Sequence, residues 1–351
     1  MNSEKSRIKD IARLAGVSTG TVDRVLHDRG EVAEKTRIRV KTILQENNYK
    51  PNVMARVLRS GKPYNLVSLL PEPTKENSFW QKHSAGMTTA LEELDPFPVN
   101  LTQIKFDMLK EEDFQKKTAL VSELNPDGVL LAPIFKTESI AFCSHLNKKK
   151  IPYIFVDGFI KNTDYLAYVG EDTFKSGRVA GQLVDMITPR EKDIIVVNIA
   201  KNLQNVHHLN NRTEGFFDYF KNMGNNIGNK LNISIPDPSA GSVQIALDKV
   251  FKLNPDIGTI FITGSKSYLI AVYLKEHSLK TVNLIGYDLL DLNVEYLKSG
   301  IINFLIGQRP EEQTYRGIKK LFEYLSLNKI PEKTEYLPVD IVTSENVDFF
   351  L

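Results

Sequence analysis

The chain has 351 residues, of which 42% are hydrophobic and 25% charged, a composition typical of globular protein with room for two or three domains. Its single cysteine, Cys143, excludes an intramolecular disulfide, and no spacing of Cys and His resembles a zinc site. Because there is no apolar run of about 18 residues and no apolar N-terminal stretch, we expect a cytoplasmic protein that is neither secreted nor inserted in a membrane.

The formal net charge of +2 conceals an uneven distribution along the chain. Residues 1–62 hold 14 Lys and Arg against 7 Asp and Glu, which gives this segment a net charge of +7. The remaining 289 residues carry a net charge of −5. A basic segment joined to an acidic body is the pattern expected of a protein that binds the phosphates of nucleic acid.

Residues 8–26 predict two short helices joined by a tight turn. The first has an apolar face with helical spacing, formed by Ile8, Ile11, Ala12 and Ala15. Gly16 ends it, and the hydroxyl of Ser18 can cap the second helix. The second helix has a core face of Val22, Val25 and Leu26, opposite Thr19, Gly20, Asp23, Arg24 and His27. Such a pair occurs in many small helical bundles, and it is also the helix-turn-helix that reads the DNA major groove.

A third helix is predicted from about Glu34 to Asn47. Its apolar residues, which would close the bundle, are Ile38, Val40, Ile43 and Leu44. Basic residues near its start suit phosphate contacts, and they are Lys35, Arg37 and Arg39. Pro51 prevents this helix from continuing, and Asn52 can cap a new short helix from Val53 to about Arg59.

The first 62 residues resemble the LacI/GalR family of bacterial regulators. The residues that match the family's D-(I/V)-A-x-x-A-G-V-S-x-x-T-V-S-R-x-L pattern are Asp10, Ile11, Ala12, Ala15 to Ser18, Thr21, Val22, Arg24 and Leu26. One departure is Asp23, where the family usually has Ser. The order and spacing of the whole block favour DNA binding over an ordinary helical bundle, and we expect the DNA-binding residues of this segment to include Ser18, Thr19, Gly20, Thr21, Arg24 and His27.

The resemblance also implies how bases are read. The family reads them from positions that correspond to Thr19, Gly20 and Arg24, and because Gly20 has no side chain we expect Thr19, Arg24 and His27 to carry most direct contacts. Arg24 on a guanine is the strongest single expectation, since the guanidinium forms two hydrogen bonds with that base.

Residues 53–59 match the hinge helix of the family, which pairs across a dimer and wedges a Leu into a minor-groove base step. Leu58 stands at that position, and Asn52 and Ala55 join it in the predicted DNA-binding set. Unstacking one base step costs a few kcal/mol, which contacts from both half-sites offset. An ordinary linker contact is the alternative for Leu58.

From Tyr64 onward, β-rich runs alternate with amphipathic helical patterns. The strands predicted include 66–70, 99–104, 128–132, 153–156, 194–199, 259–262, 282–285 and 302–306. This alternation indicates an α/β fold with a doubly wound parallel sheet, and nearly 290 residues suit two such subdomains better than one.

In the resembled family the body is two-lobed, like a periplasmic binding protein, and the chain crosses between the lobes three times. That resemblance places the crossings near Asn162, near Gln308 and within 327–332. The expected organisation is a helix-turn-helix head at 1–50, a hinge and linker at 51–62 and a body at 63–351. The N-lobe would comprise 63–162 and 308–329, and the C-lobe 163–307 and 330–351. The cleft between them is then the ligand site.

The segment after the first strand of the body, PEPTKENSFWQK, resembles the N-x-F-F/W segment of periplasmic sugar binders. The resemblance gives Asn77 a polar contact and sets Phe79 and Trp80 against the apolar face of a sugar ring. The same aromatics could equally be the first turn of a core helix, and the sequence leaves both interpretations open.

Four polar residues at predicted strand or helix ends match sugar-binding positions of the family, and they are Asp157, Arg212, Asp288 and Gln308. Carboxylates and an Arg on facing walls can bind neighbouring sugar hydroxyls. Taken singly, each is more often a helix cap or a surface ion pair. Gly264 departs from the family, which usually has Asn there, so that only Ser265 or Lys266 could substitute, and Asp172 is expected to cap a helix rather than contact ligand.

An enzyme is disfavoured because the sequence lacks the dinucleotide, Walker and nucleophile-elbow motifs. The adjacent His207 and His208 are expected in a loop at the surface or at the ligand rim. No cofactor and no metal are expected. A free solute-binding protein would not carry the basic head. The prediction is therefore a homodimeric transcription regulator, most simply a repressor, that binds a near-palindromic DNA operator and answers a sugar or, alternatively, a nucleobase or another metabolite.

Overall fold

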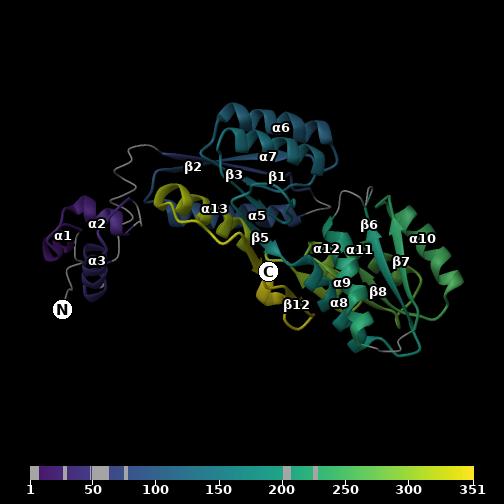
Figure 1. The fold of residues 1–351 in the computed structure, drawn as a ribbon. Helices are drawn as coiled ribbons and strands as arrows, with labels where there is room; N and C mark the ends of the chain where they lie inside the picture. The colour runs from purple at the N-terminus through teal and green to yellow at the C-terminus, as the bar shows by residue number, and fades with distance from the viewer. Residues whose placement is uncertain are drawn as a thin grey trace. The chain divides into compact units, whose positions relative to one another are not determined.

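The structure is a computed structural model that describes residues 8–26, 30–47, 49, 63–74, 78–200, 207–223 and 228–351. The chain divides into two compact units, a head at Met1–Gly61 and a body at Lys62–Leu351 (Figure 1). The predicted hinge helix lies outside the described residues, and so do four of the predicted site residues, His27, Asn52, Ala55 and Leu58, as well as Asn77 after the first strand of the body.

The head contains three helices in its described part, α1 (Ile8–Ala15), α2 (Thr19–Leu26) and α3 (Glu34–Glu46). Its small core is formed by Ile11, Ala12, Ala15, Val22, Val25 and Val40. The turn between α1 and α2 is as predicted, because Gly16 takes a positive φ of 62° and the Oγ of Ser18 accepts the backbone N–H of Thr21 at 3.1 Å.

One predicted core residue of the head is wrong. Ile38 is 58% exposed, whereas Val40 is fully buried and Ile43 and Leu44 pack against the core. Val40, Ile43 and Leu44 lie three or four residues apart on one helical face, and Ile38 is two residues from Val40, which places it on the opposite side.

The body has two lobes, each built on a six-stranded sheet. In the N-lobe the strand order is β11-β5-β4-β3-β1-β2, with β1 (Tyr64–Pro71), β2 (Val99–Phe106), β3 (Gly128–Leu131), β4 (Tyr153–Val156), β5 (Ala167–Glu171) and β11 (Thr334–Leu337). All of these strands are parallel. One face of the sheet is covered by α6 (Glu111–Leu124) and α7 (Lys136–Lys148), and the other by α5 (Phe79–Leu94) and α13 (Pro310–Leu327) (Figure 1).

The C-lobe repeats this plan with the order β12-β10-β9-β8-β6-β7. Its strands are β6 (Asp193–Ile199), β7 (Lys230–Ile235), β8 (Ile257–Ile262), β9 (Asn283–Tyr287), β10 (Phe304–Gly307) and β12 (Asp340–Val342), of which only β12 is antiparallel to its neighbour. Its helices are α8 (Thr173–Ile187), α9 (His207–Met223), α10 (Ala240–Leu253), α11 (Ser267–Glu276) and α12 (Asp291–Lys298), followed by a short 3-10 helix at Val347–Phe350.

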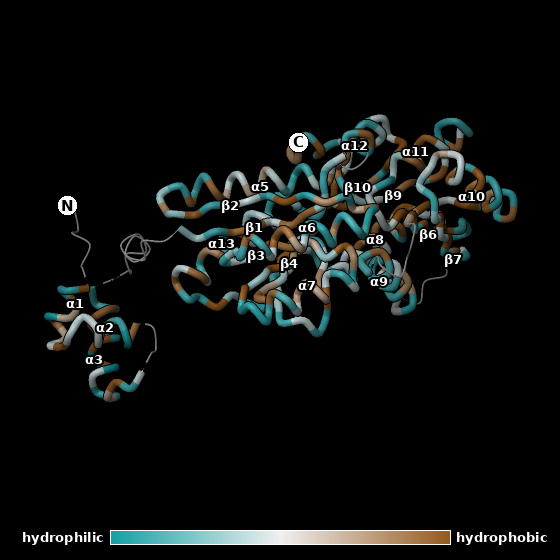
Figure 2. Tube along the Cα trace, turned by 90° about the horizontal axis from the view of Figure 1, so that it is seen from above, coloured by the Kyte–Doolittle hydropathy of each residue, from teal (hydrophilic) through white to brown (hydrophobic). Residues whose placement is uncertain are grey.

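The inner strands of each sheet are buried on both faces, which explains their continuous apolar runs. Along β6, Ile195 and Val197 pack toward the cluster formed with α10, α11 and α12. Ile194 and Val196 alternate with them and pack toward α8 and α9. In Figure 2 the outer helices alternate between hydrophilic and hydrophobic colouring along their length, as expected for helices with one face on a sheet.

The eight predicted strands are all present, with ends that differ by a few residues. The prediction did not include β5, β7, β11 or β12. Three of these lie at the edge of a sheet, are short or carry polar residues, and so lack a continuous apolar run. β5 is fully buried between β4 and β11 but has only five residues and contains Gly170.

Two of these four strands, β5 and β11, correct the predicted lobe boundaries. β5 pairs with β4 and β11 pairs with β5, so both belong to the N-lobe sheet rather than to the C-lobe. The first crossing therefore lies near Asp172 instead of Asn162, and the third lies between Leu337 and Asp340 instead of within 327–332. The second crossing, at Gln308 between β10 and α13, is where it was predicted.

Candidate functional site

A cavity of about 950 Å³ lies between the two lobes of the body. It is lined by residues that follow β3, β4 and β5 of the N-lobe and β8, β9 and β10 of the C-lobe. The carboxyl ends of both parallel sheets therefore meet at this cavity, which is the position where ligands bind in open α/β folds.

Arg212 is fixed on the C-lobe wall by close packing of α8 against α9. A Cβ added at Gly177 of α8 would lie 2.1 Å from the carbonyl oxygen of Arg212, and one at Gly215 of α9 would lie 2.0 Å from that of Phe174. Only glycine fits at these two points of contact between the helices, because a Cβ cannot lie so close to a backbone carbonyl oxygen. The glycines of α8 and α9 thus allow the close helix contact that sets the position of the Arg212 backbone.

The Arg212 guanidinium is 2% exposed and is surrounded by defined partners. Its Nε donates to Oε1 of Glu171 at 2.7 Å, Nη2 lies 2.5 Å from the same oxygen, and Nη1 donates to the carbonyl oxygen of Thr263 at 2.8 Å. Its carbon Cζ lies 3.7 Å from the centre of the Tyr287 ring, a cation–π contact. Glu171 was not predicted as a site residue, although it ends β5 beside Asp172.

Two further carboxylates, Asp157 after β4 and Asp288 after β9, line the same cavity. Each has a positive φ, 65° and 68°, in the left-handed region that Asp tolerates better than most residues. The structure therefore brings Asp157, Arg212 and Asp288 to one cavity, as predicted from their places at strand and helix ends.

The charges in this cavity depend on one another. Burial raises the pKa of both Asp157 and Asp288 to about 7, although the Arg212 charge acts in the opposite direction. Burial also raises the pKa of Glu171. Burial alone would lower the pKa of Arg212, but its carboxylate neighbours, Glu171 foremost, raise it, so the guanidinium is charged.

Phe79 and Trp80 confirm the interpretation as the first turn of a core helix, and their position at the cavity is the one that the sugar contact would require. They form the first turn of α5 and are buried, and both also line the cavity. The Trp80 ring stacks on His83, with centroids 4.6 Å apart. Because burial lowers the pKa of His83 to about 3, the imidazole is neutral at physiological pH and provides an uncharged support.

His207 and His208 were predicted in a loop, but they are the first two residues of α9. Both line the cavity, as the alternative position at a ligand rim requires. Burial and the neighbouring Arg212 lower the pKa of His208 to about 3. Burial lowers the pKa of His207, with further contributions from Lys136 and Lys161, which line the same cavity.

Gly264, which departs from the family, and the expected helix cap Asp172 both have defined positions in the structure. Gly264 and Ser265 line the cavity, and a Cβ added at Gly264 would meet its nearest atom, Cδ2 of Leu209, at an ordinary 3.4 Å. The missing side chain therefore leaves space in the cavity. Asp172 caps α8 as predicted, since its Oδ1 accepts the backbone N–H of Lys175 at 3.0 Å.

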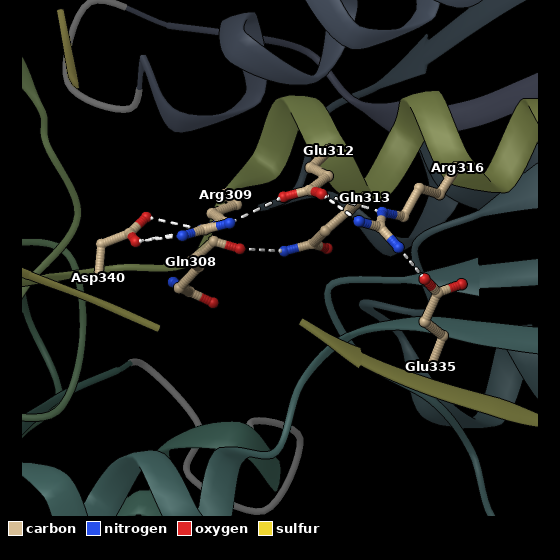
Figure 3. Close-up of polar contacts among 7 residues, drawn as sticks. All are labelled: Gln308, Arg309, Glu312, Gln313, Arg316, Glu335 and Asp340. Carbon is tan, nitrogen blue, oxygen red and sulfur yellow. Dashed lines mark hydrogen bonds and ion pairs between the residues drawn. The ribbon is translucent and has the colours of Figure 1, made fainter. Parts of the chain in front are cut away.

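The second lobe crossing carries a chain of polar contacts, and those among Arg309, Glu312, Arg316, Glu335 and Asp340 are drawn in Figure 3. Nε2 of Gln308 donates to Oδ1 of Asp288 at 2.8 Å. Arg309 follows with a positive φ of 55°, and its guanidinium binds both carboxylate oxygens of Asp340 at 2.6 to 3.1 Å. Glu312 accepts from Arg309 at 3.3 Å. Ion pairs continue the chain from Glu312 to Arg316 and from there to Glu335.

In the head, the described residues of α2 divide into two faces. Val22 and Val25 are buried, whereas the predicted DNA-contacting residues Ser18, Thr19, Gly20 and Arg24 are exposed and Thr21 is half-buried. The predicted readout face is therefore accessible for contact with DNA.

Two kinds of feature are absent among the described residues. No group of three or more His, Cys, Asp or Glu side chains among them could hold a metal ion. No helix among them is long and apolar enough to span a membrane.

Comparisons with known proteins agree with this architecture. Residues 7–52 match the model of bacterial regulatory proteins of the lacI family, and residues 68–329 match that of the periplasmic binding protein domain. The sucrose operon repressor of Lactococcus lactis subsp. lactis is 26% identical over 310 residues, which are 87% of this chain and 88% of that protein. The HTH-type transcriptional regulator DegA of Bacillus subtilis is 30% identical over 149 residues. This match covers only 42% of DegA and 42% of this chain.

A solved structure from Bacteroides fragilis, assigned to the LacI transcriptional regulators, is 30% identical with a TM-score of 0.76 and covers 82% of this chain and 99% of its own. The predicted resemblance and the predicted fold class are both confirmed by these matches. The chain belongs to the LacI family of bacterial DNA-binding regulators, with a helix-turn-helix head and a body of the periplasmic-binding-protein type.

Proposed function

We propose that the protein is a repressor that binds a specific DNA operator and releases or retains it according to a small carbohydrate held between the lobes of the body. The family supports the regulatory role, and one relative of nearly full length is named for a sucrose operon. The observation that carries the sugar assignment is the cavity in which Asp157, Arg212 and Asp288 converge from facing lobes.

This cavity suits a ring with hydroxyl groups on its rim and an apolar face. Asp157 and Asp288 can accept hydrogen bonds from hydroxyls, and Gln308 and Arg212 can donate to them. Phe79 and Trp80 provide the aromatic wall against which C–H groups of a sugar pack. A buried site of this kind rejects analogues that lack a hydroxyl, because a protein group would then stay unpaired.

DNA recognition is assigned to the exposed face of α2. Arg24 would contact a guanine, Thr19 a neighbouring base, and Ser18, Gly20 and Thr21 the DNA backbone around them. Two heads in a homodimer would read the half-sites of a near-palindromic operator, with Asn52, Ala55 and Leu58 at the hinge. The sugar controls this contact only through its different affinities for the DNA-binding and DNA-releasing states.

Trp80 gives a direct test, because it is the single tryptophan of the chain and lines the cavity. Purified protein is titrated with pentoses, hexoses, disaccharides, sugar acids, sugar phosphates, polyols and purines while the intrinsic fluorescence is recorded. We expect a saturable change in fluorescence with one carbohydrate class. We expect the affinity of D288N for that carbohydrate to be at least tenfold lower than that of the wild type. A carbohydrate response that is identical in D288N would contradict a site between the lobes.

A nucleobase effector is the second candidate, because the Phe79 and Trp80 wall would stack on a planar base as well as on a sugar. A saturable response to purines with none to carbohydrates would support that candidate and overturn the sugar assignment. The role of the head in DNA binding would be unaffected.

A further inference from the structure

Gln313 joins the two lobes at the effector cavity, although it was not among the predicted site residues. It lies in the first turns of α13 and is fully buried. Its Oε1 accepts the backbone N–H of Asp157 at 2.8 Å, and its Nε2 donates to the carbonyl oxygen of Gln308 at 3.0 Å. The second of these contacts is drawn in Figure 3.

Gln308 extends this contact into the C-lobe, since its Nε2 donates to Oδ1 of Asp288 at 2.8 Å. A single hydrogen-bonded path therefore runs from Asp157 through Gln313 and Gln308 to Asp288. It begins at the end of β4 in the N-lobe, passes the second lobe crossing and ends after β9 in the C-lobe. We call this path the glutamine relay.

The orientation of both amides in the relay is determined by their partners. Asp157 offers a backbone N–H, which only the carbonyl end of Gln313 can accept, and Gln308 offers a carbonyl oxygen, to which only the NH₂ end can donate. The Asp288 carboxylate likewise requires the NH₂ group of Gln308. Each amide is thus oriented by its own partners, Gln313 by two backbone groups and Gln308 by the Asp288 carboxylate, so the relay has one arrangement.

The two cavity residues Asp157 and Asp288 differ in the partner that binds their backbone N–H. The N–H of Asp288 donates to the carbonyl oxygen of Ile306 at 3.0 Å, a contact between neighbouring strand ends within the C-lobe. The N–H of Asp157 instead donates to the side chain of Gln313. The left-handed backbone of Asp157 therefore depends on a side chain that also binds the lobe crossing.

We propose that Gln313 is a positioning residue that ties the effector contact at Asp157 to the lobe crossing at Gln308, and through it to the effector contact at Asp288. This inference deepens the proposed function and rests on it for the identity of the effector. Gln313 does not touch the effector; it sets the backbone of one carboxylate and, through Gln308, the side chain of the other.

Thr314 provides a matched control on the next position of α13. It is also fully buried, and its Oγ1 donates to the carbonyl oxygen of His83 at 2.7 Å, which joins α13 to α5 within the N-lobe. T314V and Q313L both remove a buried side-chain hydrogen bond with little change in shape. Only Q313L breaks the relay.

The first readout needs no effector. Amide hydrogen exchange of peptides that contain Asp157 is measured for the full-length wild type, Q313L, Q313E and T314V. We expect exchange at Asp157 to accelerate at least tenfold in Q313L, because its N–H loses its acceptor. In Q313E the carboxylate still accepts this N–H but cannot donate to Gln308, so the exchange should stay near that of the wild type. Exchange in Q313L equal to that in T314V would overturn the proposal.

The second readout uses the carbohydrate that gives the saturable Trp80 response described above. Affinity for that carbohydrate should fall about tenfold in both Q313L and Q313E, and less than threefold in T314V, at comparable thermal unfolding temperatures. Wild-type affinity in Q313E would show that the Gln308 arm does not position the site and would overturn the relay.

The two readouts separate the two proposals. If no carbohydrate binds the wild type, the sugar assignment fails, while the exchange of the Asp157 amide still decides whether Gln313 holds that residue. If a carbohydrate binds the wild type and all three variants equally, the sugar assignment stands and the positioning role of Gln313 is wrong.

Discussion

At the scale of single residues, Arg212 organises the charges of the cavity. Its contacts with Glu171 and with the carbonyl oxygen of Thr263 hold the guanidinium between both walls of the site. Removing one partner of a buried ion pair costs about 3 to 5 kcal/mol, because the other charge then lacks compensation. Arg212 therefore has a structural role that is independent of any ligand.

The raised pKa values of Asp157 and Asp288 predict how stability depends on pH. Both groups have a pKa of about 7 in the folded body against an ordinary value of 3.8, so the folded state binds protons more tightly than the unfolded state. Their contribution to stability is fully present below about pH 3.8 and is lost as the pH rises toward 7.

D157N and D288N should each flatten this dependence, because the amide does not titrate and is not charged at neutral pH. The free energy of unfolding, measured by urea denaturation between pH 5 and pH 8, should decline less with pH in either variant than in the wild type. Parallel curves for the wild type and both variants would contradict the assigned direction of the pKa shifts.

At the scale of elements, the site was predicted from the family resemblance together with the position of its residues at strand ends. Asp157 and Asp288 follow apolar runs that are long enough to recognise as β4 and β9, and their convergence follows from the geometry of parallel sheets. Glu171 was missed because β5 was missed, so that its position at a strand end was not visible. Gln313 was missed because a polar residue within a helix gives no sign of facing a lobe crossing.

The packing of α8 on α9 is a second element whose consequence can be tested. A methyl group at Gly177 would lie 2.1 Å from the carbonyl oxygen of Arg212, so G177A must push the two helices apart. Overpacking of this kind costs about 1 to 3 kcal/mol. We expect G177A to lower stability by this amount in urea denaturation and also to weaken carbohydrate binding, because Arg212 moves with α9.

Gly241 in α10 is the control for this substitution. A Cβ there meets no atom within 4 Å, and its φ is not in the left-handed region. G241A should leave carbohydrate affinity unchanged and increase stability slightly, by up to about 1 kcal/mol, since Ala favours helix over Gly. If G177A and G241A behave alike, the close approach of α8 and α9 is not what positions Arg212.

At the scale of the whole molecule, the three lobe crossings determine what the body can do. Asp172 at the first crossing and Gln308 at the second line the cavity, and so does Tyr336, next to the third crossing. Gln308 also binds Asp288. Ion pairs connect Asp340 of the C-lobe through Arg309, Glu312 and Arg316 to Glu335 of the N-lobe (Figure 3). A ligand that bridges the lobes and contacts Asp288 or Gln308 would therefore act directly at the second crossing.

The family assignment and the α/β architecture were predictable from the sequence because both rest on local patterns, the helix-turn-helix block and the alternation of strands and helices. The lobe boundaries were not, since they depend on which sheet two short strands join. That choice is made by pairing between residues far apart in the chain, such as Thr334 with Tyr168.

We propose that a carbohydrate in the cavity of the body controls DNA binding by the head. The most direct measurement is the affinity of the full-length protein for an operator selected from a random-sequence DNA library, with and without the carbohydrate that changes Trp80 fluorescence. The wild type, D288N and R24A are compared.

We predict that the carbohydrate changes wild-type operator affinity by at least tenfold, that D288N keeps operator affinity but loses this response, and that R24A loses specific binding in both conditions. Operator affinity of the wild type that stays constant while the carbohydrate saturates the Trp80 response would contradict control of DNA binding by the carbohydrate.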